Sequence, residues 1–137
     1  MKTLSAIIFI ILTGNGHLPA QIPDSVKYQS LDPYYFHLRY ITDSNSILID
    51  VREFFEFRHA RIKGAVNVPS SGNLELTSDT IRKNSSLFLY CYSGTRSRKA
   101  ADFFCKKGFL NVYDLEGGII QWRRDNMPVE KKRIKRR

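Results

Sequence analysis

An apolar run of four residues, Leu87 to Tyr90, leads into a short glycine-containing turn, and a helix-like stretch from Ser97 to Lys107 follows. A run this short, bounded by a turn, suits a buried strand. Short apolar strands that alternate with helices favour a parallel sheet covered on both faces, because the connecting helices lie on the two sides of such a sheet. This stretch therefore restricts the chain to the α/β class.

The same alternation extends along most of the chain. Strands are expected at 27–30, 47–50, 65–68, 87–90 and 112–115, and helices at 32–41, 53–61, 74–84, 97–107 and 119–124. Asp32 and Pro33 suit the N-cap and the first position of the first helix. The expected fold is one α/β domain with a central, mostly parallel sheet of about five strands and helices on both faces. Such sheets bind ligands beyond the carboxyl ends of their strands, which is where Cys91 follows Tyr90.

The N-terminus has the pattern of a secretory signal peptide. A short basic start precedes an apolar run from Leu4 to Leu12, and small and turn-forming residues follow from Gly14 to Ala20. The run is shorter than the roughly 20 apolar residues of a membrane span. We predict a signal peptide over 1–20 and export to the periplasm or the exterior, with a cut after Gly16 and a buried helix as the alternatives.

Most of the net charge of +9 lies outside the predicted domain, which spans 26–128. The tail at 129–137 holds six lysines and arginines and one glutamate, a net charge of +5, and residues 26–128 carry the remaining +4, since Lys2 and Asp24 cancel. A block of like charge is usually solvated, and contact with an anionic membrane surface is the alternative. Nucleic-acid binding is not expected in the absence of a recognition motif. We expect a monomer.

The turn that starts at Cys91 combines three features that favour a thiolate. A glycine-containing turn can aim successive backbone N–H groups at one point, the N-terminus of the following helix adds partial positive charge, and Arg96 adds a full charge. The thiolate is the nucleophilic form of cysteine. The alternative for Cys91 taken alone is a small buried residue without chemistry.

Four segments in order resemble the rhodanese-like sulfurtransferases. The segment from Cys91 to Ser97 resembles their active-site loop, and 48–53 resembles their strand followed by Asp-Val-Arg-Glu. The segment 62–69 resembles their Ile-Pro-Gly-Ala element, and 108–118, with Trp122 after it, resembles their closing strand and Gly-Gly turn. The match covers about residues 26–128. It departs from the pattern at Ala60-Arg61, at Lys63 and at Tyr92, where thiosulfate-using members often carry a basic residue.

The resemblance implies a sulfurtransferase with Cys91 as the catalytic nucleophile. Cys91 would take a sulfane sulfur from a small anionic donor such as thiosulfate and pass it from a persulfide to a thiol or cyanide acceptor. No metal and no organic cofactor is implied. The residues expected to bind the substrate are Tyr92, Ser93, Gly94, Thr95, Arg96 and Ser97. Asp50 and Arg52 are expected to form a structural ion pair that supports the loop, and a salt bridge to a carboxylate is the alternative role of Arg96.

Other functions stay open at this point. A non-catalytic binding or sulfur-carrier module on the same fold is the first alternative. A phosphatase or arsenate reductase is disfavoured, because loops of that kind usually place five residues between Cys and Arg, whereas four separate Cys91 from Arg96. A thiol–disulfide oxidoreductase is disfavoured because Cys105 should lie ~13 Å along the helix from its start, beyond disulfide reach. Cys91 and Cys105 are therefore predicted to be separate thiols.

Overall fold

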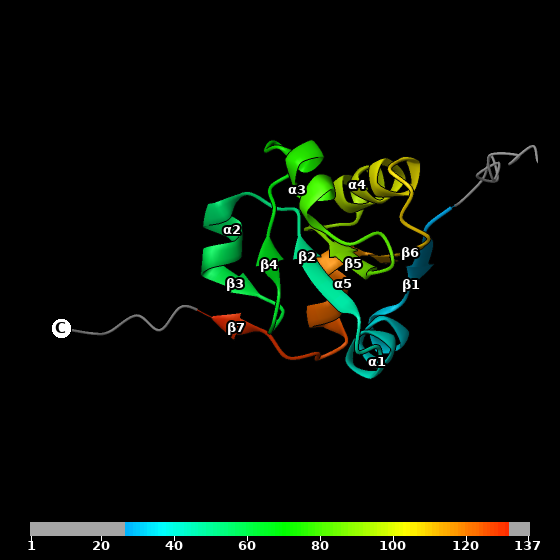
Figure 1. Ribbon diagram of the computed structural model, residues 1–137. Helices are drawn as coiled ribbons and strands as arrows, with labels where there is room; N and C mark the ends of the chain where they lie inside the picture. Colours follow the sequence, from blue (N-terminus) through cyan, green and yellow to red (C-terminus); the bar gives the residue numbers. More distant parts are fainter. Residues whose placement is uncertain (1–26, 132–137) are drawn as a thin grey trace, which may run out of the picture.

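The computed structural model describes residues 27–131 (Figure 1). The predicted signal peptide and residues 132–137 of the basic tail lie outside the described residues, so those predictions remain predictions. Within 27–131, no helix is long and apolar enough to cross a membrane.

The domain is built on a five-stranded sheet in which all pairs of neighbouring strands are parallel, in the order β1-β6-β5-β2-β4. Its strands are β1 (Gln29–Leu31), β2 (Ser46–Asp50), β4 (Val66–Asn67), β5 (Ser86–Tyr90) and β6 (Asn111–Leu115). The helices are α1 (Pro33–Thr42), α2 (Phe54–His59), α3 (Leu74–Thr80), α4 (Thr95–Lys106) and α5 (Gly118–Arg124). The predicted α/β class and five-stranded parallel sheet are confirmed.

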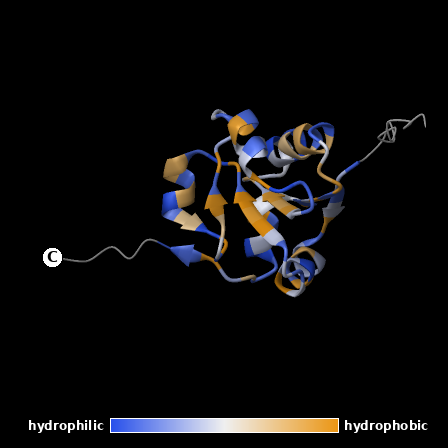
Figure 2. Cartoon of the chain, in the orientation of Figure 1, coloured by the Kyte–Doolittle hydropathy of each residue, from blue (hydrophilic) through white to orange (hydrophobic). Residues whose placement is uncertain are grey.

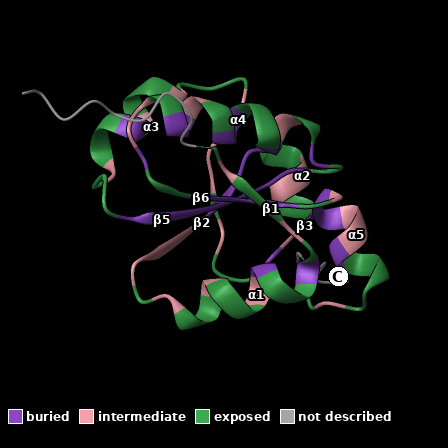
Figure 3. Cartoon of the chain, turned by 90° about the vertical axis from the view of Figure 1, so that its right-hand side faces the viewer, coloured by how far each residue is buried: buried purple, intermediate pink, exposed green. Residues whose placement is uncertain are grey.

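Two apolar layers sandwich the sheet, and the alternation of side chains along β5 explains both. Leu87 and Leu89 pack with α4 residues such as Phe104 on one face, whereas Phe88 packs with Phe36 of α1 and Trp122 of α5 on the other. In Figure 1, α3 and α4 accordingly lie on one side of the sheet and α1 on the other. Figure 2 shows the hydrophobic residues concentrated on the central strands, and Figure 3 shows those strands as the most buried part of the chain.

Asp32 and Pro33 in the sequence predicted the start of the first helix correctly. The Asp32 side chain accepts hydrogen bonds from the backbone N–H groups of Tyr34 (2.9 Å) and Tyr35 (3.1 Å), and Pro33 occupies the first turn. This confirms the predicted N-cap. The structure places β1 at Gln29–Leu31, one to two residues later than expected, because pairing with β6 sets its register.

Two other differences from the predicted elements have physical causes. The helix α4 begins at Thr95, two residues before the predicted start, because Gly94 adopts a positive φ of 100° and caps it. A short antiparallel ribbon was not predicted: β3 (Ala60–Arg61) pairs with β7 (Glu130–Lys131), where Arg61 and Glu130 form an ion pair at 3.4 Å. The start of the segment interpreted as a tail therefore packs against the domain.

Candidate active site

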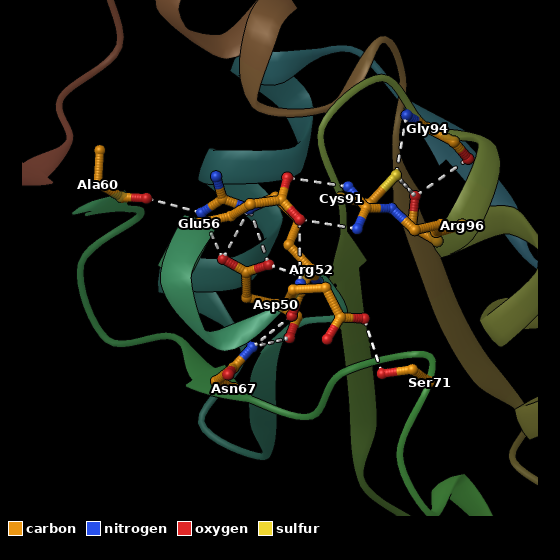
Figure 4. Close-up of polar contacts among 11 residues, drawn as sticks. Asp50, Arg52, Glu56, Ala60, Asn67, Ser71, Cys91, Gly94 and Arg96 are labelled. Carbon is orange, nitrogen blue, oxygen red and sulfur yellow. Dashed lines mark hydrogen bonds and ion pairs between the residues drawn. The ribbon is translucent and has the colours of Figure 1, made fainter. Parts of the chain in front are cut away.

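Cys91 lies at the carboxyl end of β5, where the chain turns into α4. Its side chain is buried, with 1% of the residue exposed. The Gly94 backbone N–H donates a hydrogen bond to Cys91 Sγ at 3.1 Å (Figure 4). Gly94 has a φ of 100°, a backbone conformation that glycine adopts readily and that would strain any other residue at this position. A backbone donor and the positive end of a 12-residue helix thus face one sulfur atom.

The rest of the predicted substrate-binding loop divides into exposed and buried residues. Tyr92, Ser93 and Thr95 are exposed, Tyr92 to 52%. Ser97 is fully buried, and its Oγ lies 3.5 Å from Cys91 Sγ. The structure therefore places Ser97 beside the sulfur and not at the helix N-cap, the position that Gly94 occupies.

Arg96 forms a bidentate ion pair with Glu56 of α2, at 2.8 and 3.0 Å (Figure 4). These two hydrogen bonds lower the pKa of the Glu56 carboxyl and raise the pKa of Arg96. Cys91 also contributes to the raised pKa of Arg96, and Figure 4 shows the Arg96 guanidinium next to the Cys91 sulfur. The arrangement is the salt bridge considered as the alternative role of Arg96.

Asp50 and Arg52 form a buried ion pair at the end of β2. Arg52 Nη2 donates to Asp50 Oδ2 at 2.6 Å and to the Ala60 carbonyl at 2.6 Å. Asn67 Nδ2 donates to the carbonyl oxygens of Asp50 and Arg52, at 3.0 and 2.8 Å (Figure 4). The pair thereby ties the end of β2 to the segment that follows α2, the helix that carries Glu56.

Two parts of the site were missed by sequence reasoning. Asp114 of β6 is buried and accepts a hydrogen bond from Ser97 Oγ at 2.5 Å. The start of α5 holds the beginning of the loop, since the Ile119 N–H donates to the Cys91 carbonyl at 2.9 Å. A charged residue inside an otherwise apolar strand was the signal that could have identified Asp114.

A groove of about 210 Å³ lies beside the loop, between α2 and α5. Exposed aromatic side chains of Phe55 and Tyr92 line it, together with Glu56, His59 and Arg123.

Cys105 lies apart from the loop in the core, where burial raises the pKa of its thiol. Both cysteines are free thiols, as predicted. Within 27–131, no three His, Cys, Asp or Glu side chains gather as a metal site.

Known proteins share this sequence and fold. Residues 37–125 match the rhodanese-like domain. The thiosulfate sulfurtransferase GlpE of Actinobacillus succinogenes is 33% identical over 90 residues, which are 66% of this chain and 80% of that protein. The tRNA uridine(34) hydroxylase of Hamiltonella defensa is 35% identical over 87 residues, 60% of this chain, but the match spans only 24% of that relative. The crystal structure of a rhodanese-related protein from Thermoplasma volcanium has a TM-score of 0.65 at 29% identity, and the match covers 77% of this chain and all of that one.

The match to the rhodanese-like domain covers well over half of the chain and includes the Cys91 loop and the three other segments that resemble the family. The fold agrees with it, with Cys91 at the carboxyl end of the central strand β5. The chain therefore belongs to the rhodanese-like family.

Proposed function

We propose that the protein is a sulfurtransferase that carries a sulfane sulfur on Cys91. The observation that carries the proposal is the Cys91 sulfur itself, which accepts the Gly94 N–H at 3.1 Å at the N-terminus of α4. A sulfur held by a backbone donor and a helix N-terminus is suited to negative charge, in the thiolate and in the persulfide alike. The relationship to a protein named thiosulfate sulfurtransferase supports the proposal.

The proposed reaction has two displacements. The Cys91 thiolate attacks the outer sulfur of a donor such as thiosulfate; the new S–S bond forms as the old one breaks, and sulfite leaves with the electron pair. A thiol or cyanide then attacks the outer sulfur of the persulfide, and Cys91 leaves as the thiolate. The N–H groups of the loop from Tyr92 to Ser97 would stabilise both anionic forms. No other oxidant or reductant is consumed.

The activity is tested by thiocyanate formation from thiosulfate and cyanide, with hydrolysis of an aryl phosphate measured in parallel. We expect turnover of the sulfur donor and none of the phosphate, because four residues separate Cys91 from Arg96 and leave little room for a tetrahedral oxyanion. Phosphate hydrolysis without sulfur transfer would contradict the proposal.

Export of the protein, and contact of its basic tail with anionic lipid, also remain proposals.

Glu56 is expected to limit the use of anionic donors, because it neutralises the Arg96 guanidinium beside Cys91. Glu56→Gln should raise kcat/KM for thiosulfate roughly 3- to 10-fold at low ionic strength, an effect of the size expected for a partly exposed ion pair. High salt should reduce the gain, since it screens the released charge. Glutamine keeps the hydrogen bond to the Glu53 N–H that begins α2.

Two variants control this experiment. Asp79→Asn makes the same charge change at an exposed position of α3 and should leave kcat/KM unaltered. In the Arg96→Ala background, Glu56→Gln should have no effect, because the cation that it releases is gone. A gain of the same size in that background would refute the role given to the ion pair.

A further inference from the structure

Asp114 is a buried carboxylate that the proposed reaction does not use. It lies in β6 with none of its surface exposed. Its oxygens accept hydrogen bonds from Ser97 Oγ at 2.5 Å and from Ser30 Oγ at 3.2 Å. Among the ion pairs of residues 27–131, none includes Asp114. Burying a carboxylate without a cationic partner is costly, so its position next to the cysteine loop calls for an explanation.

Ser97 connects this carboxylate to the sulfur. Its Oγ lies 2.5 Å from Asp114 Oδ1, 3.1 Å from the Gly94 carbonyl and 3.5 Å from Cys91 Sγ. A serine hydroxyl has one proton to donate. The shortest contact is the one to Asp114, and a carboxylate is a stronger acceptor than a carbonyl. An ionised Asp114 therefore holds the proton that Ser97 could otherwise donate to the sulfur.

We propose that Asp114 is a positioning residue that controls, through the single hydroxyl proton of Ser97, when the Cys91 sulfur carries negative charge. Ionised Asp114 keeps the hydroxyl turned away from the sulfur. Protonated Asp114 donates to Ser97 Oγ instead, and Ser97 turns its proton toward the Cys91 thiolate or persulfide. The proposal rests on the proposed function only in that Cys91 is the reacting atom.

The charges around Asp114 fit such a role. Burial raises the pKa of Asp114 to about 6, although the hydrogen bonds from Ser97 and Ser30 oppose the rise. The charge of Arg98 in α4 also opposes the rise in the pKa of Asp114, whereas the charge of Glu116, just after β6, adds to it. Burial, followed by the charges of Asp102 and Asp114, raises the pKa of Tyr28, which lies just ahead of β1. Asp114 thus changes charge near pH 6, and the Ser97 hydroxyl is the group that can relay this change to the sulfur.

The test is the rate at which iodoacetamide alkylates Cys91 between pH 5 and pH 10, in a Cys105→Ala background so that one thiol reacts. The proposed relay predicts a rate profile with two steps, the lower one near pH 6 from Asp114. Asp114→Asn should remove that step and raise the rate at pH 7 roughly tenfold, because the competing negative charge is gone. Ser97→Ala should also remove the lower step, whereas Ser97→Thr, which keeps the hydroxyl, should retain it.

Asp102→Asn is the matched control, since it removes an exposed carboxylate of α4 and should leave both steps in place. The proposal is overturned if folded Asp114→Asn keeps the lower step, or if Ser97→Ala keeps it, because Asp114 would then act without Ser97. Should Asp114→Asn fail to fold, the Ser97→Ala and Ser97→Thr pair decides alone. The alkylation needs no sulfur donor, so its outcome is independent of whether the protein transfers sulfur.

Discussion

Cys91→Ala is expected to abolish sulfur transfer while the protein stays folded. Covalent catalysis has no substitute once its nucleophile is removed, so we expect turnover to fall about a thousandfold or more. The fold should lose only about 1 kcal/mol, because a single buried sulfur atom is removed from the core cluster formed with Leu89 and Ala100. Thiocyanate formation measures the first effect and thermal unfolding followed by circular dichroism the second.

Cys105→Ala is the matched control for this experiment. Cys105 is also a buried thiol on the α4 side of the sheet, but it lies near the end of that helix, away from the loop. The Cys105→Ala variant should retain sulfur transfer and lose about as much free energy of unfolding as Cys91→Ala. Substantial sulfur transfer by Cys91→Ala would show that Cys91 is not the sulfur carrier. Loss of transfer in both variants would contradict the expectation that only the loop cysteine is needed.

Among the glycines of residues 27–131, Gly118 is the one at which substitution by alanine is expected to affect folding most. Gly118 has a φ of 61°, and an added Cβ would lie 2.5 Å from the Tyr92 carbonyl oxygen and 2.7 Å from that of Cys91. Backbone atoms cannot move aside as a flexible side chain can, so the loop or the start of α5 must shift. We expect a loss of roughly 4 kcal/mol in the free energy of unfolding, with sulfur transfer reduced as Cys91 is displaced.

Gly108→Ala is the control that separates the effect of the steric clash at Gly118 from the effect of a positive φ alone. Gly108 also has a positive φ, 89°, but an added Cβ there would meet nothing within 4 Å. It should cost only about 1 kcal/mol, the price of a left-handed residue other than glycine, and leave activity intact. Urea denaturation measures both variants. Equal losses for the two would mean that the contact between α5 and the cysteine loop contributes nothing to stability.

The sequence predicted those features that depend on neighbouring residues. The apolar run of β5, the turn at Gly94 and the helix after it are adjacent in the chain, and so are Asp32 and Pro33 at the start of α1. The buried pair of Asp50 and Arg52 was also predictable, because its partners are two residues apart. In each case the spacing along the chain alone brings the groups together.

The partners of the loop residues could not be predicted in this way. Glu56 and Arg96 are 40 residues apart, and their contact depends on how α2 packs beside the loop. Asp114 and Ser97 are 17 residues apart and meet because β6 pairs with β5. The Gly-Gly turn was identified only by its resemblance to the family, and the sequence does not show that Gly118 lies against the carbonyls of Cys91 and Tyr92. Tertiary packing decides all three contacts.

The central claim is that Cys91 carries a sulfane sulfur, and the intact mass of the protein tests it most directly. The mass is measured before and after incubation with thiosulfate, with Cys91→Ala treated in parallel. We predict a gain of about 32 Da, one sulfur atom, which cyanide removes and which the variant does not show. No gain with thiosulfate or with an organic persulfide as donor, or an equal gain on Cys91→Ala, would contradict the account.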